Sequence, residues 1–286
     1  NIETTMTTIT RAKEIALLNG LSEEEVLDRA GEHLIVMNDL DELHRFFADG
    51  MCEQILSNRA AGRDTAWILP FGPVGQYPYF IERVNRERIP LGNVRFYFMD
   101  EYCDENGREV PQDHPLSFRG KLHAMFSRID RALLPDLSNV LFPDSGNIGE
   151  LKERLATEHL CVTYGGVGIH GHLAFNEPEP GVRNSDPRVV RVNYTVTINA
   201  IREGIGGNLE NFPRKALTLG MNQLFAAEKM IIFCRNGVSS IDWANTVLRL
   251  ALFGTPGDDY PVTYLKQHPD WLVVTDRETL KTPILI

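Results

Sequence analysis

The sequence contains few cysteines, and none of them lie close together. No two have the CxxC spacing that is typical of zinc and redox sites; the four are Cys52, Cys103, Cys161 and Cys234. Widely separated cysteines favour free thiols over a disulfide framework. We therefore expect an intracellular protein and place it in the cytoplasm.

Positive charge is also scarce. The chain has 29 lysines and arginines against 39 aspartates and glutamates, a formal charge of −10. Nucleic acids and anionic membranes are bound by basic surfaces, so we expect neither as a partner. The chain also lacks an apolar run of membrane-spanning length, and no charged segment precedes an apolar one at its start. With an ordinary hydrophobic share of 43%, these absences favour a soluble globular protein.

Short apolar runs alternate with segments of helical periodicity. This alternation predicts an α/β fold, a doubly wound, largely parallel, Rossmann-like sheet with helices on both faces. A capping box at Ser22 and Glu25 opens a short helix before it. We expect an N-terminal helical extension over residues 1–32 and a single α/β domain over residues 33–286. The expected strands are 33–37, 66–69, 94–99, 160–164, 189–197, 230–234 and 271–275, and the expected helices are 10–18, 22–30, 39–59, 77–87, 116–128, 151–159, 198–202, 214–226 and 240–252.

One glycine-rich stretch stands out, YGGVGIHGHLAFNEP at residues 164–178. It continues an apolar run that reads as a buried strand. Glycines at such a place let the backbone approach a ligand closely, and the ionisable side chains of His170, His172 and Glu177 follow. In α/β proteins, ligands bind where loops leave the carboxyl ends of the strands. The stretch is therefore a candidate active site.

A second candidate lies in the sequence FMDEY, residues 98–102. Asp100 stands at the end of an apolar strand, and partial burial there raises the pKa of a carboxyl group. A carboxyl group with a raised pKa is suited to proton transfer near neutral pH. A lone aspartate at such a place would more often cap a helix or a turn. We favour catalysis because this stretch and the one at residues 164–178 resemble the signatures of one family, as described next.

Together, the two stretches resemble the signatures of the glucosamine-6-phosphate deaminase (isomerase) family, which reads GGVGNDGHIAFNEP and MDEY at the matching places. The resemblance covers roughly residues 33–280. It implies that Asp100 is the general base that moves a proton between C2 and C1 during aldose–ketose isomerisation. It also implies that His172 opens the sugar ring with Glu177 as a supporting carboxylate. No redox cofactor is implied, and relatives include both monomers and hexamers, so a homo-oligomer is left open.

Residue 170 departs from that resemblance, because the family has an aspartate where this chain has His170. A neutral imidazole brings no negative charge, and a protonated one would repel a protonated His172. The exchange therefore removes support from the ring-opening base. An alternative is a metal site built from His170 and His172 with Glu177 or Asp100. We rank it below a metal-free site and expect neither metal nor cofactor.

The expected substrate-binding loop departs as well. The family reads LPTG followed by Gly or Ser and TP, whereas this chain reads LPFGPVG at residues 69–75. Both threonines are lost, and a proline has no backbone N–H to donate. Arg235 stands near the place of the family's missing phosphate-binding lysine, around residues 239 and 240. Its guanidinium group could substitute for that lysine, since it suits bidentate binding of phosphate, but we favour a solvated surface residue. The substrate-binding residues that the resemblance implies are Phe71, Gly72, Pro73, Gly166 and Arg202.

The function expected from these observations is an amino-sugar-phosphate deaminase/isomerase, of the type that converts glucosamine 6-phosphate to fructose 6-phosphate and ammonia. One alternative is a divergent enzyme for a different sugar that lacks the 6-phosphate. Another is a non-catalytic sugar-phosphate-binding protein, and a lactonase of the neighbouring 6-phosphogluconolactonase branch ranks lower. Residues 203–212 are expected to form either a mobile lid or an ordinary surface loop.

Overall fold

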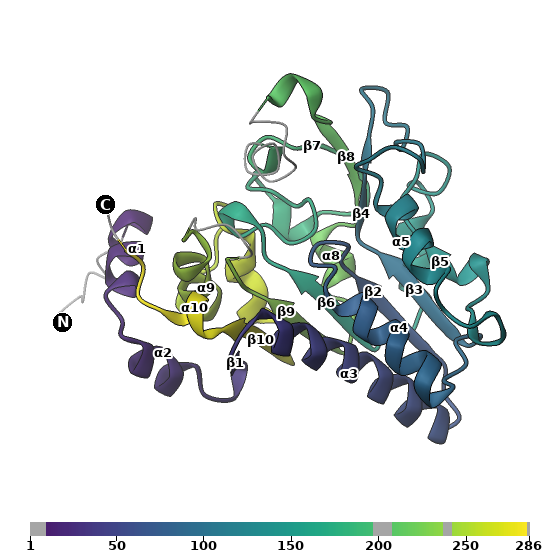
Figure 1. Cartoon of the computed structure of the whole chain (residues 1–286). Helices are drawn as coiled ribbons and strands as arrows, with labels where there is room; N and C mark the ends of the chain where they lie inside the picture. The colour runs from purple at the N-terminus through teal and green to yellow at the C-terminus, as the bar shows by residue number, and fades with distance from the viewer. Residues whose placement is uncertain (1–9, 197–207, 237–241, 285–286) are drawn as a thin grey trace.

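Seven parallel strands form the centre of the computed structural model, which describes residues 10–196, 208–236 and 242–284 (Figure 1). Their order across the sheet is β1-β10-β9-β6-β2-β3-β5, and every pair of neighbours is parallel. The strands are β1 Leu34–Met37, β2 Thr65–Leu69, β3 Val94–Phe98, β5 Val140–Leu141, β6 Val162–Gly166, β9 Lys229–Phe233 and β10 Trp271–Asp276.

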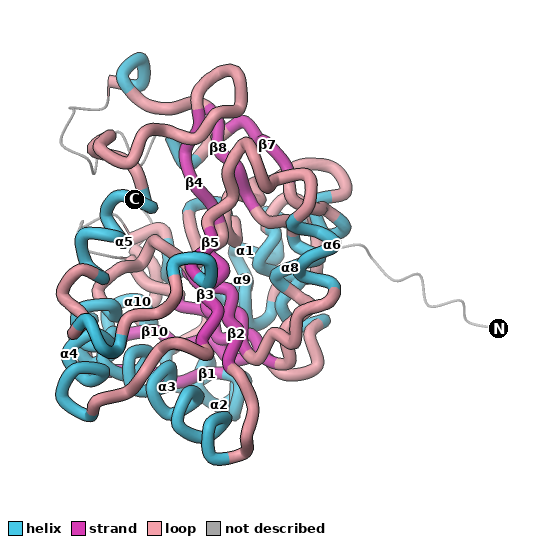
Figure 2. Tube along the Cα trace, turned by 90° about the vertical axis from the view of Figure 1, so that its right-hand side faces the viewer, coloured by secondary structure: helices cyan, strands magenta, loops and turns pink. Residues whose placement is uncertain are grey.

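Helices cover both faces of this sheet, because its strands are apolar on both sides. In β2, Trp67 packs in one hydrophobic cluster with α3, α4 and α5, whereas Ile68 packs in a second cluster with α6, α8 and α9. Figure 2 shows α3 and α4 on one side of the strands and α6 and α8 on the other. The predicted doubly wound fold is confirmed. The helices are α1 Arg11–Asn19, α2 Glu23–Ala30, α3 Leu40–Ala60, α4 Gln76–Glu87, α5 Phe118–Phe126, α6 Leu151–Ala156, α8 Met221–Leu224, α9 Ala244–Phe253 and α10 Arg277–Leu280.

The helices α2, α3 and α5 each begin where a side chain satisfies a backbone amide of the first turn. Ser22 accepts from the amide of Glu25, whose carboxylate accepts from the amide of Ser22 in return, so the predicted capping box is confirmed. Asp39 opens α3 in the same way. Ser117 caps α5, which explains why that helix begins at Phe118 rather than at the predicted residue 116.

A second, antiparallel sheet of three strands was not predicted. It consists of β4 Asp100–Cys103, β8 Lys215–Thr218 and β7 Arg188–Arg191, in the order β4-β8-β7. The helix predicted over residues 214–226 is therefore wrong in its first half, where β8 pairs with strands on both sides. Figure 1 shows this small sheet standing beyond the end of β3, which continues into β4 after one residue.

The strand predicted over residues 189–197 is too long, because β7 ends at Arg191. The amides of residues 193–195 donate to the carboxylate of Glu177 instead of to a neighbouring strand. The helix predicted over residues 198–202 lies outside the described residues.

The two N-terminal helices pack against the C-terminal third of the chain. Arg11 of α1 forms an ion pair with Asp259 and donates to the carbonyl of Thr255. Arg249 of α9 is fully buried and donates to the carbonyl of Leu21, between α1 and α2. The division of the chain at residue 32 stays a prediction.

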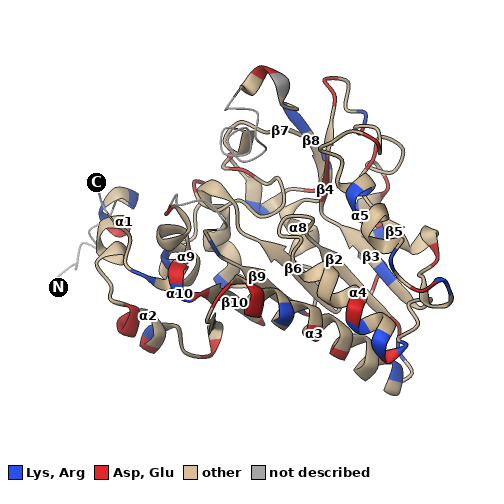
Figure 3. Ribbon diagram, in the orientation of Figure 1, with Lys and Arg blue, Asp and Glu red and all other residues tan. Residues whose placement is uncertain are grey.

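Charged side chains lie on the outer helices, as α3 and α4 in Figure 3 show, and β2 and β6 carry none. Within residues 10–196, 208–236 and 242–284, no helix combines the length and the apolar character needed to span a bilayer.

Candidate functional site

A cavity of about 290 Å³ opens at the carboxyl edge of the large sheet. Residues that follow β2, β3, β6 and β9 line it, which is where the parallel topology predicts a ligand site. Its size lies near the lower end of the range of about 300–1,000 Å³ that is usual for small-molecule sites. The polar and ionisable side chains in its wall include those of Asp100, Tyr102, His172, Thr195, Arg235, Asn236 and Trp243.

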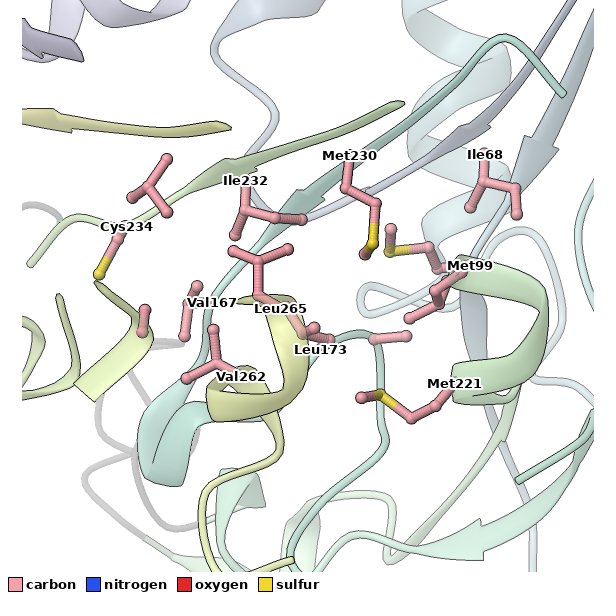
Figure 4. Close-up of a cluster of buried hydrophobic side chains, with 14 of the residues drawn as sticks. Ile68, Met99, Val167, Leu173, Met221, Met230, Ile232, Cys234, Val262 and Leu265 are labelled. Carbon is pink, nitrogen blue, oxygen red and sulfur yellow. The ribbon is translucent and has the colours of Figure 1, made fainter. Parts of the chain in front are cut away.

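The hydrophobic core holds the catalytic candidates in place. Met99 immediately precedes Asp100, and Leu173 immediately follows His172; both side chains are buried in the cluster drawn in Figure 4. The backbone of Met99 donates to the carbonyl of Leu69 and accepts from the amide of Leu219. Asp100 is therefore fixed at the point where the chain leaves the large sheet for the small one.

Asp100 is almost fully buried, with 7% of its surface exposed. Among the residues that the structure describes, no hydrogen-bond donor contacts its carboxyl group. Burial, and to a smaller extent the charge of Glu101, raises the pKa of Asp100 to about 8. The predicted raised pKa is thus confirmed, and the group carries its proton at neutral pH.

The adjacent carboxylate has a different environment. Glu101 accepts hydrogen bonds from its own neighbour Tyr102, from the amides of Phe118 and Arg119, and from the hydroxyl of Ser117. It therefore joins β4 to the start of α5. The two consecutive carboxyl groups therefore differ in environment, because within the described residues only that of Glu101 accepts hydrogen bonds.

His172 is held with one particular nitrogen toward the protein. Its Nδ1 lies 2.8 Å from the carbonyl oxygen of Ile169 and 3.3 Å from Oγ1 of Thr195. A carbonyl oxygen can only accept, so Nδ1 carries the hydrogen, and Nε2 is the basic nitrogen of the neutral ring. The ring packs edge-on against Gly168, where a Cβ atom would overlap it. Only glycine at this position leaves room for the imidazole.

Glu177 is buried and holds a turn of the chain. Its carboxylate accepts from the amides of Asn193 at 2.8 Å, Tyr194 at 3.1 Å and Thr195 at 2.7 Å. The turn brings the hydroxyl of Thr195 to His172. The sequence did not single out Thr195, because it lies in an alternating segment that was interpreted as a strand.

His170 has a left-handed backbone conformation with φ of 58°. Its ring lies against Tyr194, with the ring centroids 4.5 Å apart, and it does not line the cavity. In the described part of the chain, no three His, Cys, Asp or Glu side chains are placed to hold a metal ion, so His170 and His172 belong to no such group there.

The loop after β2 presents an apolar wall to the cavity. Phe71 is 5% exposed, and its ring stacks on Tyr77 and on Phe118. Pro73 lines the cavity beside Gly72. Gly166 lies so close to this loop that a Cβ atom there would be 2.8 Å from the carbonyl oxygen of Gly72. Four of the predicted substrate-binding residues, Phe71, Gly72, Pro73 and Gly166, thus line one cavity, and their roles stay predictions.

Arg235 corrects one expectation. It is half-buried and lines the cavity, whereas we expected a solvated surface residue. It lies near His44 of α3, and burial together with the charge of Arg235 lowers the pKa of His44 to about 4. Within the described ranges, Arg235 is the only lysine or arginine in the cavity wall. The predicted Arg202 lies outside the described residues, as do residues 239 and 240 and the first half, 203–207, of the segment 203–212.

The fold and the cavity define an α/β protein with ionisable side chains gathered at the carboxyl ends of a parallel sheet. No protein-family model matches the chain. Among curated proteins, the glucosamine-6-phosphate deaminase of Aeromonas hydrophila is 32% identical over 220 residues, which cover 73% of this chain and 76% of that protein. The enzyme of the same name from Parabacteroides distasonis is 27% identical and covers 85% of this chain and 88% of its own length. The chain belongs to the glucosamine-6-phosphate deaminase family.

Solved structures support the same fold. A monomeric glucosamine-6-phosphate deaminase of the NagB superfamily superposes with a TM-score of 0.72 at 21% identity, covering 86% of this chain and 98% of that one. A 6-phosphogluconolactonase from Thermotoga maritima gives a TM-score of 0.61 at 18% identity, covering 85% of this chain and 99% of that one.

Proposed function

We propose that this protein is an amino-sugar-phosphate deaminase/isomerase, which converts glucosamine 6-phosphate and water to fructose 6-phosphate and ammonia. The observation that carries the proposal is that Asp100 and His172 line one cavity although they come from different strand ends. A carboxyl group and an imidazole that face one small ligand can exchange protons with neighbouring atoms of a single sugar. Family membership supplies the substrate class.

In the first step, His172 acts at Nε2. This nitrogen takes the proton of the C1 hydroxyl and returns one to the ring oxygen, so the C1–O5 bond breaks and the open-chain aldehyde forms. Because Nδ1 keeps its own hydrogen, the ring can carry the proton between the two oxygens without changing its orientation.

In the second step, the ionised Asp100 removes the proton from C2 and returns it to C1 by way of an enediol-like intermediate. The aldehyde is reduced to an alcohol as C2 is oxidised to an imine, and the proton that the nitrogen gives up balances the one that O1 takes up, so no external electron acceptor is needed. Water hydrolyses the imine to the ketose, and the nitrogen leaves as ammonia. A carboxylate whose conjugate acid has a pKa of about 8 is a stronger base than an exposed aspartate, which suits removal of a proton from carbon.

A second candidate is the same chemistry on a sugar without the 6-phosphate. The wall formed by Phe71 and Pro73 favours it, because that wall is apolar and Pro73 has no N–H to donate to a phosphate. Arg235 favours the phosphorylated substrate, since guanidinium groups bind phosphate well.

The test is a panel of glucosamine 6-phosphate, free glucosamine and N-acetylglucosamine 6-phosphate, scored for both ammonia and ketose. We expect stoichiometric ammonia and fructose 6-phosphate from the first, loss of turnover in Asp100→Asn, and full activity in the exposed control Asp28→Asn. Ammonia from free glucosamine alone would establish the second candidate. Thermal stabilisation by the sugar phosphates without turnover would identify a binding protein instead.

We also propose a cytoplasmic location. All four cysteines are buried free thiols, which is typical of proteins kept in reducing compartments.

A further inference from the structure

We infer that Thr195 is a positioning residue for His172, held at the imidazole by the turn of residues 193–195. The expected effect on turnover rests on the proposed function, whereas the contacts between Thr195 and His172 do not depend on it.

Two contacts of the His172 ring are made with neutral oxygens. The Ile169 carbonyl and the Thr195 hydroxyl oxygen both lie within hydrogen-bond distance of Nδ1, so a hydrogen on Nδ1 is shared between two acceptors. This pair keeps Nε2 as the basic nitrogen. When Nε2 takes a proton, the two oxygen dipoles stabilise the resulting positive charge.

The hydroxyl of Thr195 has little freedom to move away. Thr195 is 4% exposed, so water does not readily replace it at the ring. Its amide donates to Glu177 at 2.7 Å, the shortest of the three amide contacts that the carboxylate accepts. Glu177 therefore supports the imidazole through the backbone of the turn, and Thr195 is the side chain that transmits that support.

His170 braces the same turn from the outside. Its ring packs on Tyr194, whose amide is the middle one of the three that Glu177 holds. Tyr194 is 42% exposed. The residue at which the chain departs from the family signature thus contributes packing to the turn, and Thr195 adds a second contact to the imidazole of His172 beside the Ile169 carbonyl.

The experiment compares Thr195→Val, which removes the hydroxyl at nearly constant volume, with Thr195→Ser, which restores it. The matched control is Thr163→Val, since Thr163 is fully buried and its hydroxyl donates to the carbonyl of Leu224 away from the cavity. One readout is the ¹⁵N chemical shifts of the ring nitrogens of His172 in histidine-labelled protein, assigned with His172→Gln. The other is kcat and KM for ammonia release from glucosamine 6-phosphate.

We expect the wild type to show a protonated Nδ1 and a basic Nε2. In Thr195→Val the Ile169 carbonyl keeps this tautomer, and the Nδ1 signal is expected to shift because one of the two acceptors of its hydrogen is lost. Loss of one such hydrogen bond lowers kcat by about tenfold with KM changed less than about twofold. Thr195→Ser restores both readouts, and Thr163→Val changes neither.

Unchanged ring shifts in Thr195→Val would overturn the inference, whatever the activity. So would a rise in KM at constant kcat, because Thr195 would then contact the substrate instead. If the wild type releases no ammonia, the proposed function fails, and the ring shifts still decide whether Thr195 orients His172.

Discussion

Replacing Asp100 by asparagine removes a pH dependence of folding stability whose sign and approximate size follow from the burial of the carboxyl group. The substitution keeps the shape of the side chain and removes its ionisation. Below a pH of about 4, the wild-type carboxyl group is protonated in both the folded and the unfolded chain, so the two proteins are expected to have similar free energies of unfolding.

The difference grows as the pH rises. Between the ordinary pKa of 3.8 and the folded-state pKa of about 8, only the unfolded chain releases the proton. The unfolded state then binds fewer protons, so the wild type loses about 1.4 kcal/mol for each pH unit, and about 4 kcal/mol by pH 7. Above pH 8 the group is ionised in both states and the difference levels off. Asp100→Asn does not suffer this loss and is expected to be the more stable protein at neutral pH.

The assay is urea unfolding of both proteins in steps from about pH 4 to pH 9, with Asp28→Asn as an exposed control. Taking the difference between wild type and variant cancels the other ionisable groups. A difference that stays flat over this range would mean that Asp100 is ionised when folded, and the argument for a strong base in the cavity would fail. The same pKa predicts that kcat/KM for ammonia release rises with pH toward about 8, and a plateau already reached near pH 6 would contradict it.

Three further substitutions test the site and the fold, each against Gly92→Ala, where a Cβ atom meets nothing within 4 Å. Gly168→Ala displaces the ring of His172 and is expected to lower kcat by about a hundredfold with little change in the urea midpoint, because misplacing a catalytic group costs far more rate than stability; normal turnover would show that the ring is not held there. Arg235→Met should raise KM for glucosamine 6-phosphate by about tenfold to a hundredfold, as expected for a lost hydrogen bond to a charged group, and an unchanged KM would exclude contact with the phosphate. Gly220→Ala drives a Cβ atom into the backbone of the neighbouring loop and should lower the free energy of unfolding by about 3 kcal/mol; stability equal to the control would show that the loop yields freely.

Local pattern was enough for six of the seven strands of the large sheet, whereas the two-residue strand β5 was not predicted. The six are short apolar runs, and burial on both faces leaves such runs little alternative. Because parallel strands end at one edge, the sequence also predicted that Asp100 and His172 would meet. The structure confirms that they line one cavity.

Local pattern failed where the outcome depended on a distant partner. Residues 215–218 have helical spacing, yet they form β8 because β4 and β7 offer edges on both sides. Whether a segment pairs in a sheet depends on strands remote in the sequence, and its local periodicity carries no information about them.

The sequence by itself determined the parallel sheet, the family and the strand ends that carry Asp100 and His172, since all of these follow from contiguous patterns of residues. Only the tertiary structure decided that Arg235 faces the cavity, that His170 faces Tyr194, and that Thr195 reaches the imidazole. The direction of a side chain depends on the packing of segments far apart in the chain. For that reason the support of His172 became visible only once the turn at residues 193–195 was seen beside it.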